Sequence, residues 1–464
     1  MGKYQAYPDY KDSGVEWLGD IPISWIALPI KMVSKIFNGA TPKSGVAPFW
    51  DGDIPWVTPA DLGKSVSPYI SKGSRSITAA GYNSCGVSLV PKNSIILASR
   101  APIGTLGIAS NDLCTNQGCK SLVVKDRFVP EFLYYVLLSS TEQLNLLGRG
   151  STFLELSADD LGSYKIPSPS ECEQQKIASF LDHETAKIDT LIDKQQQLIQ
   201  LLKEKRQAVI SHAVTKGLNP NAPMRDSGVE WLGEVPEHWS VTRIKYYTHV
   251  FEQGWSPQCD SRPAEDDEYG VLKVGCVNYG EFRAEENKAL PIELEPQRQY
   301  SLKKGDLLIS RANTKELVGS AAVVERDYNN LILCDKLYRL RFDEAVNPQL
   351  VAYFLSLFVV RQQIEIEATG ASHSMQNIGQ STIKEMPVVI PPIEEANELV
   401  STIKEQMTVF EALESKAVKG IKLLQERRTA LISAAVTGKI DVRRHASHPT
   451  GDLQSSKSTV HVAR

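Results

Sequence analysis

The stretch Leu201-Leu-Lys-Glu-Lys-Arg-Gln-Ala-Val-Ile-Ser-His-Ala-Val-Thr215 returns as Leu423-Leu-Gln-Glu-Arg-Arg-Thr-Ala-Leu-Ile-Ser-Ala-Ala-Val-Thr437. Each copy closes a long segment with a seven-residue repeat, which is typical of a coiled-coil seam facing a partner helix. At ~1.5 Å per residue, each helix would be about 60 Å long. Two amphipathic helices lying on their own domains are the alternative, which fits poorly with such length and no internal Pro. The repeat positions are Leu181, Ile188, Gln195, Leu202 and Val209, then Ile403, Phe410, Ala417, Leu424 and Leu431.

A second repeated stretch opens each half of the chain. Asp12-Ser-Gly-Val-Glu-Trp-Leu-Gly-Asp-Ile-Pro22 returns as Asp226-Ser-Gly-Val-Glu-Trp-Leu-Gly-Glu-Val-Pro236, followed by Trp25 and Trp239 respectively. Consecutive identity of this length indicates an internal duplication. The Gly, Pro and Trp spacing predicts a tight turn whose indole packs into a core, with a docking surface as the alternative.

Further matched segments complete the organisation. Residues 92–101 match 303–312 as a turn before an apolar strand, and 130–139 match 348–357 as a helix begun by Pro. Gly150-Ser-Thr recurs as Gly370-Ala-Ser, and Pro-rich breaks precede each long helix. The predicted parts are a domain at 1–170, a helix at 171–217, a hinge at 218–225, a domain at 226–392, a helix at 393–440 and a disordered tail at 441–464.

The predicted fold is α+β, with two globular α/β domains related by a pseudo-twofold axis and separated by two long antiparallel coiled-coil helices. The first helix delivers the chain to the second domain, so the second helix must run back along the first to bury its seam. Gln195 and Ala417 are equivalent mid-helix positions and are expected near the axis.

Composition limits the class of protein. A chain of 464 residues suits two to four domains. The net charge of −4 means that DNA binding would need local clusters of Lys and Arg, or another subunit. Seven scattered cysteines without a Cys-x-x-Cys pair indicate buried thiols in a reducing cytoplasm rather than a disulfide framework or a zinc site. The apolar run 350–360 is too short to cross a bilayer, and the polar N-terminus lacks a signal-peptide core, so we expect a cytoplasmic protein without a membrane partner.

The matched segments lie at the domain edges and helix ends, whereas the segments between them differ in sequence from one half to the other. Residues 39–44, 56–61 and 116–120 stand opposite 254–259, 271–278 and 334–338. Such a fused, diverged duplication could bind two copies of one partner and two different targets, such as DNA half-sites ~34 Å apart. The repeated openings, the Ser-Arg strands, the Pro-rich breaks and the helix ends together resemble the specificity subunit of type I restriction–modification enzymes, over all but about the last twenty residues.

The resemblance implies two target-recognition domains that read the halves of a gapped double-stranded DNA sequence. It also implies that the long helices set the gap and bind two modification (methyltransferase) subunits, through which restriction/translocase subunits join. The holoenzyme would methylate adenine at N6 and act as an ATP-dependent endonuclease. S-adenosylmethionine, ATP and Mg²⁺ would be used by the partners, with no cofactor in this chain.

Side chains able to read base edges or contact phosphates are the candidate DNA-binding residues. Arg100 and Arg311 occupy the same place in both halves, which favours an ion pair or a phosphate contact over base reading. Lone loop lysines are usually solvated, and the acidic run 265–268 is read as a solvated loop rather than a metal site. The candidates are Thr41, Lys43, Thr58, Asp61, Arg100, Asn116, Gln117, Ser151 and Thr152 in the first half, and Lys273, Asn278, Arg311, Asn313, Lys315, Lys336, Ser372 and His373 in the second.

The familiar catalytic motifs are missing from the sequence. It contains neither Gly-x-x-x-x-Gly-Lys-[Ser/Thr], nor Asn-Pro-Pro-[Phe/Tyr], nor His-Glu-x-x-His, so we expect no enzyme activity and no metal site in the chain alone. A protein–protein scaffold without sequence-specific DNA binding is the main alternative, and an enzyme with unfamiliar motifs is a third. A ternary complex with a methyltransferase and specific DNA would distinguish the first reading from the second.

Overall fold

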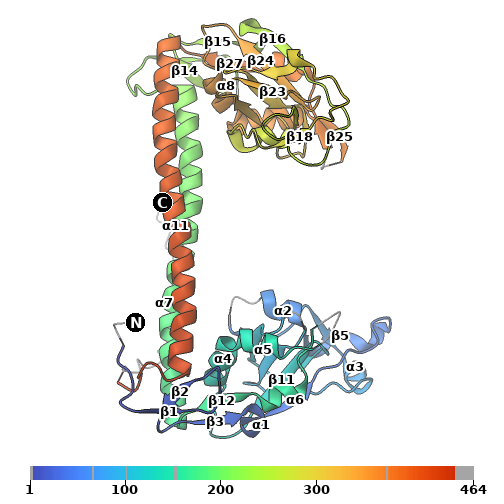
Figure 1. Cartoon of the computed structure of the whole chain (residues 1–464), viewed down its shortest axis with the longest axis vertical. Coiled ribbons are helices and arrows are strands. Elements are labelled where there is room, and N and C mark those ends of the chain that lie inside the picture. The colour runs from blue at the N-terminus through green and yellow to red at the C-terminus, as the bar shows by residue number, and fades with distance from the viewer. Residues whose placement is uncertain (1–3, 65–66, 101, 150–153, 373–374, 445–464) are drawn as a thin grey trace, which may run out of the picture. The chain divides into compact units, whose positions relative to one another are not determined.

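The computed structural model describes residues 4–64, 67–100, 102–149, 154–372 and 375–444. The chain divides into two compact units, each discontinuous in sequence. Unit 1 is Met1–Gln195 with Lys419–Arg464, and unit 2 is Gln196–Val418. The boundaries fall inside the two long helices, α7 (Glu171–Lys216) and α11 (Ile393–Val436), so each unit contains one mixed α/β domain and part of both helices (Figure 1).

Unit 1 is built on a five-stranded sheet in the order β4-β11-β8-β9-β6. Neighbours are antiparallel except for the parallel pair β6/β9. The predicted apolar strand is confirmed as β8, whose four residues are all buried. A second sheet has the order β10-β5-β7. The strands are β4 (Ser34–Asn38), β5 (Trp50–Val57), β6 (Tyr69–Ile70), β7 (Arg75–Ile77), β8 (Ile95–Ala98), β9 (Leu106–Ala109), β10 (Cys114–Thr115) and β11 (Cys119–Val124).

Unit 2 repeats the first four strands of this sheet order. Its strands β16-β24-β20-β22 are antiparallel throughout and follow the order of β4-β11-β8-β9. Two further sheets have the orders β18-β17-β23-β19 and β21-β26-β25. Two-stranded sheets pair β13 (Met224–Asp226) with β14 (Glu234–Pro236) and β15 (Ser240–Arg243) with β27 (Pro387–Ile390). The strands are β16 (Thr248–Gln253), β17 (Gly270–Leu272), β18 (Asn287–Ala289), β19 (Ser301–Leu302), β20 (Leu307–Ser310), β21 (Ala312–Asn313), β22 (Ala321–Val323), β23 (Tyr328–Ile332), β24 (Leu337–Phe342), β25 (Thr369–Ser372) and β26 (Met375–Asn377).

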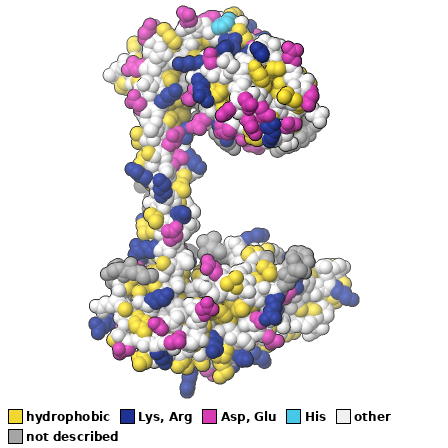
Figure 2. Space-filling view, viewed as in Figure 1, with side chains coloured by type: hydrophobic (Ala, Val, Ile, Leu, Met, Phe, Trp, Pro, Cys, Tyr) yellow, Lys and Arg dark blue, Asp and Glu magenta, His cyan; other side chains and the backbone are white. Residues whose placement is uncertain are grey.

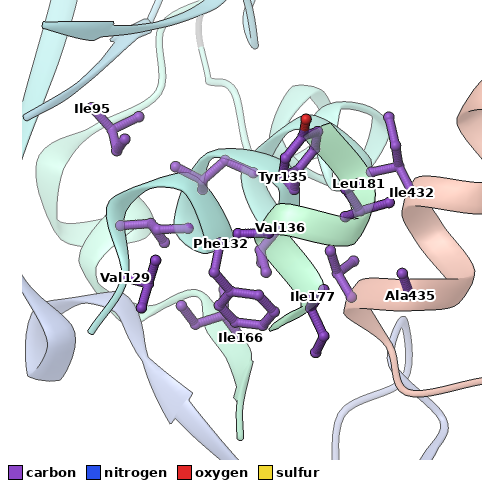
Figure 3. Close-up of a cluster of buried hydrophobic side chains, with 14 of the residues drawn as sticks. Ile95, Val129, Phe132, Tyr135, Val136, Ile166, Ile177, Leu181, Ile432 and Ala435 are labelled. Atoms are coloured by element: carbon purple, nitrogen blue, oxygen red, sulfur yellow. The ribbon is translucent and has the colours of Figure 1, made fainter. Parts of the chain in front are cut away.

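A helix begun by Pro lies between sheet and long helices in each unit, as the matched segments predict. In unit 1 this is α4 (Pro130–Ser139), where Phe132 and Val136 face Ile177 of α7 and Ala435 of α11 in one buried cluster (Figure 3). In unit 2, α8 (Pro348–Leu355) takes the equivalent position within a core that also includes both long helices. The domain core and the helix seam are therefore continuous in both units.

The long helices run in opposite directions within each unit. In unit 1, Asp189 of α7 pairs with Arg428 of α11, with Oδ1 and Nε 2.9 Å apart. In unit 2, Arg206 of α7 pairs with Glu411 of α11 at 3.6 Å. Asp189 corresponds to Glu411 in the duplication, and Arg206 to Arg428, so each unit makes the same ion pair with the helices exchanged.

The seven-residue positions lie where the coiled-coil prediction puts them. Leu181, Ile188, Leu202, Ile403, Ala417 and Leu431 are buried, and Gln195, Val209, Phe410 and Leu424 are half-buried. These side chains pack the helices and domains together, so the intramolecular seam, rather than a surface offered to a partner, is their place in the fold. The meeting of Gln195 and Ala417 at an axis stays a prediction.

The repeated openings wrap the helix C-termini, and both indoles are buried as the packing prediction requires. Trp25 is 0% and Trp239 is 1% exposed. Trp239 lies against Gly217, which follows α7, and Trp25 lies against Gly438, which follows α11. The backbone N–H of Asp441 donates to the Gln5 carbonyl at 2.7 Å. The end of the second helix is thus bound by the start of the chain, as the end of the first is bound by the start of the second half.

The helix α11 ends at Val436, before the predicted boundary at 440, because Gly438 takes a left-handed φ of 72°. A Cβ at this position would lie 2.4 Å from Cδ of Pro22. We therefore expect Gly438→Ala to lower the free energy of unfolding by about 1–3 kcal/mol or more, through backbone strain and collision. Urea denaturation measures the change.

The matched control is Gly420→Ala in the middle of α11, where an added Cβ meets nothing within 4 Å. It should raise the free energy of unfolding by about 0.5–1 kcal/mol, because Ala loses less backbone entropy than Gly in a helix. Equal effects of the two substitutions would contradict the roles assigned to the left-handed φ of Gly438 and to its close approach to Pro22.

Candidate nucleic-acid interface

The loop after β4 brings four of the candidate residues together. Gly39 lies so close to the turn before β11 that a Cβ would be 1.9 Å from the Asn116 carbonyl oxygen. The Ala40 N–H donates to the Thr115 carbonyl at 3.0 Å. On this base Thr41, Lys43 and Gln117 are exposed, with the Thr41 hydroxyl donating to Oε1 of Gln117. Asn116 holds the turn itself, because its Oδ1 accepts from the Gly118 N–H at 3.0 Å.

Two buried indoles donate hydrogen bonds to backbone carbonyls of this loop. Trp56 Nε1 donates to the Ala40 carbonyl at 3.0 Å, and Trp50 Nε1 to the Lys43 carbonyl at 3.3 Å. The exposed guanidinium of Arg75 stacks on the Trp50 ring, 3.7 Å from its centroid. Arg75 is a cation beside the loop that the sequence analysis missed, since no repeat or motif marks it.

Asp61 and Thr58 do not belong to this surface, which corrects their assignment as base readers. Asp61 is 8% exposed and accepts hydrogen bonds from the N–H groups and hydroxyls of Thr58 and Ser74. Burial alone would raise the pKa of this carboxyl, but the hydrogen bonds from Ser74 and Thr58 outweigh it and hold the pKa below its ordinary value. The carboxylate closes a loop and has no exposed edge to offer a base.

Arg100 and Arg311 make different contacts despite their equivalent positions. Arg100 forms an ion pair with Glu155, with Nε and Oε2 3.1 Å apart, and the buried Lys120 reaches the same carboxylate at 3.6 Å. Arg311 donates from Nη1 to the Asp335 carbonyl at 3.3 Å. The ion pair of Arg100 agrees with the structural alternative, although its side chain remains 46% exposed.

The candidates of unit 2 fall into two groups. Asn278 and Asn313 bond to one another at 3.2 Å, and Lys273 lies 4.0 Å from Glu286, so these are engaged within the domain. Lys315 and Lys336 are exposed. Ser372 ends β25, and Ser151, Thr152 and His373 lie outside the described residues.

The sequence analysis also missed a polar pair that joins the loop after β16 to the turn before β24. The hydroxyl of Ser256 donates to Oδ1 of Asp335, and the backbone N–H of Asp335 donates back to that hydroxyl at 3.1 Å. The sequence signal was present, since Gly254-Trp-Ser-Pro257 matches Gly39-Ala-Thr-Pro42. It was read as divergence because the residues between and after these positions differ.

Several other charged groups of unit 2 are paired within the domain. Arg339 is 1% exposed and donates to Glu252 Oε1 at 2.7 Å and to the Ser301 carbonyl, while Arg341 pairs with Asp306 at 2.6 Å. In the acidic run, Glu268 pairs with Arg262, whose hydrogen bonds lower the pKa of Glu268 to about 2. Figure 2 shows acidic and basic side chains interspersed over the displayed face of both units.

The seven cysteines differ in burial, so the expectation of buried thiols holds only in part. All seven cysteines are unpaired, and burial raises the pKa of the Cys114, Cys119 and Cys334 thiols to about 12, while Cys172 is exposed. Within the described ranges, none of the helices is long and apolar enough to span a membrane.

Comparison with known proteins gives consistent relatives. Residues 22–201 match the family described as type I restriction modification DNA specificity domain. The MjaIX specificity subunit of Methanocaldococcus jannaschii is 41% identical over 185 residues, which are 39% of this chain and 42% of that protein. This chain thus matches about two fifths of that relative's length. The EcoKI specificity subunit of Escherichia coli K12 is 22% identical over 95% of this chain and 94% of its own.

Solved structures show the same fold. The HsdS subunit from Thermoanaerobacter tengcongensis aligns with a TM-score of 0.54 and 16% identity, over 90% of this chain and 98% of that chain. A chain from a structure of a type I R-M system aligns with a TM-score of 0.69 and 15% identity, over 90% and 99%. At these identities the likeness establishes the architecture alone, and it confirms the predicted fold class.

Replacing Asp61 tests its structural role. Asp61→Asn should lower the free energy of unfolding at pH 7 by about 1.5–3 kcal/mol, the range for hydrogen bonds to a charged group. Because the folded-state pKa is depressed, the stabilisation is present above the unfolded pKa of roughly 3.9 and is lost as pH falls through the folded pKa. The difference from wild type should therefore narrow in urea titrations below about pH 4.

Asp53→Asn, at an exposed carboxylate of β5, is the control and should leave stability within about 0.5 kcal/mol. A difference between Asp61→Asn and wild type that stays constant down to pH 2 would show that the charge of Asp61 is not what stabilises the loop.

Proposed function

We propose that this chain, which belongs to the family of specificity subunits of type I restriction–modification enzymes, reads an asymmetric, gapped sequence in double-stranded DNA. The observation that carries the proposal is that the two domains share one backbone arrangement but expose different side chains on it. Both domains place the same four-stranded order and the same glycine-anchored loop beside it, while the exposed side chains differ. A homodimer presents identical surfaces and suits a symmetric target, whereas a fused and diverged pair suits two different half-sites.

Local charge supports DNA contact even though the chain is acidic overall. Lys43 and Arg75 are exposed at the loop of unit 1, and Lys315 and Lys336 are exposed in unit 2. Lysine and arginine side chains bind phosphates and set the orientation of a protein on the duplex, while neighbouring polar groups read bases. With a net charge of −4, most of the non-specific attraction to DNA would come from partner subunits.

The partners we propose are two modification subunits, with restriction subunits joining through them. Exposed leucines on the long helices recur in matching positions of the two units. Unit 1 exposes Leu191 of α7 (46%) and Leu423 of α11 (64%), and unit 2 exposes their duplicates Leu413 of α11 (42%) and Leu201 of α7 (61%). Two equal apolar positions on two equal helix pairs fit two copies of one partner, which would bury these side chains on binding.

Catalysis belongs to those partners in this proposal. The modification subunits would use S-adenosylmethionine to methylate adenine at N6, and the restriction subunits would use ATP and Mg²⁺ for cleavage. The chain alone would contribute recognition, and its helices would set the length of the gap between the half-sites. Partner binding and DNA reading would then lie on separate elements, the helices and the domain loops.

The experiment is a methylome of cells that express the chain with its modification subunit, compared with cells that lack the chain. We expect a gapped, asymmetric motif with methyladenine on both strands, present only with the chain. Exchange of residues 1–170 for those of a relative should change one half of the motif and preserve the other half and the gap. A change in both halves would contradict reading by separate domains. Complex formation without any motif would instead support a protein scaffold.

The leucine pairs predict the stoichiometry of the complex. The double variant Leu191→Lys with Leu423→Lys should lose one of two modification subunits, because a charge at an apolar contact is costly to bury. The equivalent variant Leu413→Lys with Leu201→Lys should lose the other, and the quadruple variant should lose both. Native mass spectrometry measures the composition, and Leu146→Lys, at an 86% exposed domain position, is the control. Retention of both subunits by the quadruple variant would exclude these helices as the docking surface.

A further inference from the structure

In both domains a hydroxyl donates a hydrogen bond to a longer polar side chain at the same place in the fold, but the acceptor is an amide in one domain and a carboxylate in the other. In unit 1 the Thr41 hydroxyl donates to the amide oxygen of Gln117. In unit 2 the Ser256 hydroxyl donates to a carboxylate oxygen of Asp335. Each bond joins the loop that leaves the first strand of the sheet, β4 or β16, to the turn that enters its neighbour, β11 or β24.

The strand register shows that the two pairs are equivalent. Asn38 of β4 lies opposite Lys120 of β11, and Gln253 of β16 lies opposite Tyr338 of β24. In both cases the hydroxyl residue follows the first member by three positions, and the acceptor precedes the second by three. The pairs therefore occupy the same place relative to the ladder, and their difference in chemistry arises from the sequence alone.

The backbone beneath the pairs is also the same. The Ala40 N–H donates to the Thr115 carbonyl at 3.0 Å, and the equivalent Trp255 N–H donates to the Leu333 carbonyl at 2.9 Å. A Cβ on Gly39 would lie 1.9 Å from a carbonyl oxygen of the turn, and one on Gly254 would lie 2.0 Å from another. Glycine is thus required at both positions, and it brings the hydroxyl within reach of the turn.

The paired groups are open to solvent. Thr41, Gln117 and Ser256 are exposed, and Asp335 is half-buried. A hydroxyl that binds one oxygen of the longer side chain restricts its rotamer, so the remaining polar atoms are oriented before any ligand arrives. Exposed lysines flank both pairs, Lys43 in the loop of unit 1 and Lys336 after Asp335, where they can neutralise phosphates.

Resting on the DNA-reading function above, we propose that Gln117 and Asp335 are the equivalent base-reading residues of the two domains, positioned by Thr41 and Ser256. Gln117 would read adenine, because its Nε2 can donate to N7 while the second lone pair of Oε1 accepts from N6. Asp335 would read cytosine, because a carboxylate has only acceptors and the N4 amino group is a donor. The two half-sites thus differ at one matched position through the chemistry of one matched side chain.

The test uses the purified complex of the chain with its modification subunits and a DNA library with both half-sites randomised. Binding selection followed by sequencing gives the preference at every position. Gln117→Asp should replace an adenine preference by cytosine at one position of one half-site, and Asp335→Gln should do the reverse in the other. Each discrimination should change by about 10- to 100-fold, as for loss of a bidentate base contact. The unchanged half-site is the internal control, and Asp267→Gln at an exposed loop carboxylate should change nothing.

Variants of the positioning residues separate orientation from folding. Thr41→Val should weaken the preference at the position affected by Gln117→Asp, and Thr41→Ser should restore it. Where an exchange variant loses binding, Gln117→Ala and Asp335→Ala should bind with a relaxed preference at that one position. A wild-type complex that selects a gapped motif, with both exchange variants selecting the same motif, would overturn this proposal alone. A wild-type complex that selects no motif would overturn the proposed function and, with it, this proposal.

Discussion

Each domain completes its hydrophobic core with helix segments from distant parts of the chain. In unit 1, the buried Phe132 of α4 shares one cluster with Leu181 of α7 and Ile432 of α11. In unit 2, Phe354 of α8 shares one with Val214 of α7 and Leu399 of α11. Burying one such side chain contributes ~1.5–3 kcal/mol, so loss of either helix segment would remove much of what holds a domain together. The antiparallel packing of the helices is therefore a condition for both domains to fold.

The same constraint explains why the duplication is most visible at the domain edges and helix ends. Residues that pack against the long helices, including Trp25 on Gly438 and Trp239 on Gly217, have to fit nearly identical surroundings in both units. The ion pairs Asp189–Arg428 and Arg206–Glu411 repeat for the same reason. Thr41, Gln117 and Ser256 are exposed, so their side chains are free to differ, and there the two domains acquire unlike chemistry on a common frame.

Four of the candidate DNA-binding residues lie together in the structure, and their contact with DNA stays a prediction. Thr41, Lys43, Asn116 and Gln117 come together around one loop, although nothing in their spacing of some seventy positions indicates it. Asp61 and Thr58 were misassigned, because an acidic or hydroxyl side chain in a loop serves equally well to cap backbone N–H groups. Arg75 was missed because stacking on Trp50, a residue distant in the chain, is what places it beside the loop. Asp335 was missed because its segment, although aligned with 116–120, differs in sequence and was taken as divergent.

The sequence by itself determined the repeat, the two long helices, the order of the parts and the buried indoles. Periodicity and the positions of Pro and Gly can be read within a single segment, and the repeats can be found by comparing the sequence with itself. None of these features requires knowledge of which residues are neighbours in space. The tertiary structure alone decided that each compact unit takes part of both helices, and which polar side chains remain exposed after their neighbours are satisfied. The sequence aligned Gln117 with Asp335 through segments 116–120 and 334–338, but only the folded structure shows that each lies at the same ladder position beside a bonded hydroxyl, because these hydrogen bonds join segments that are distant in the chain.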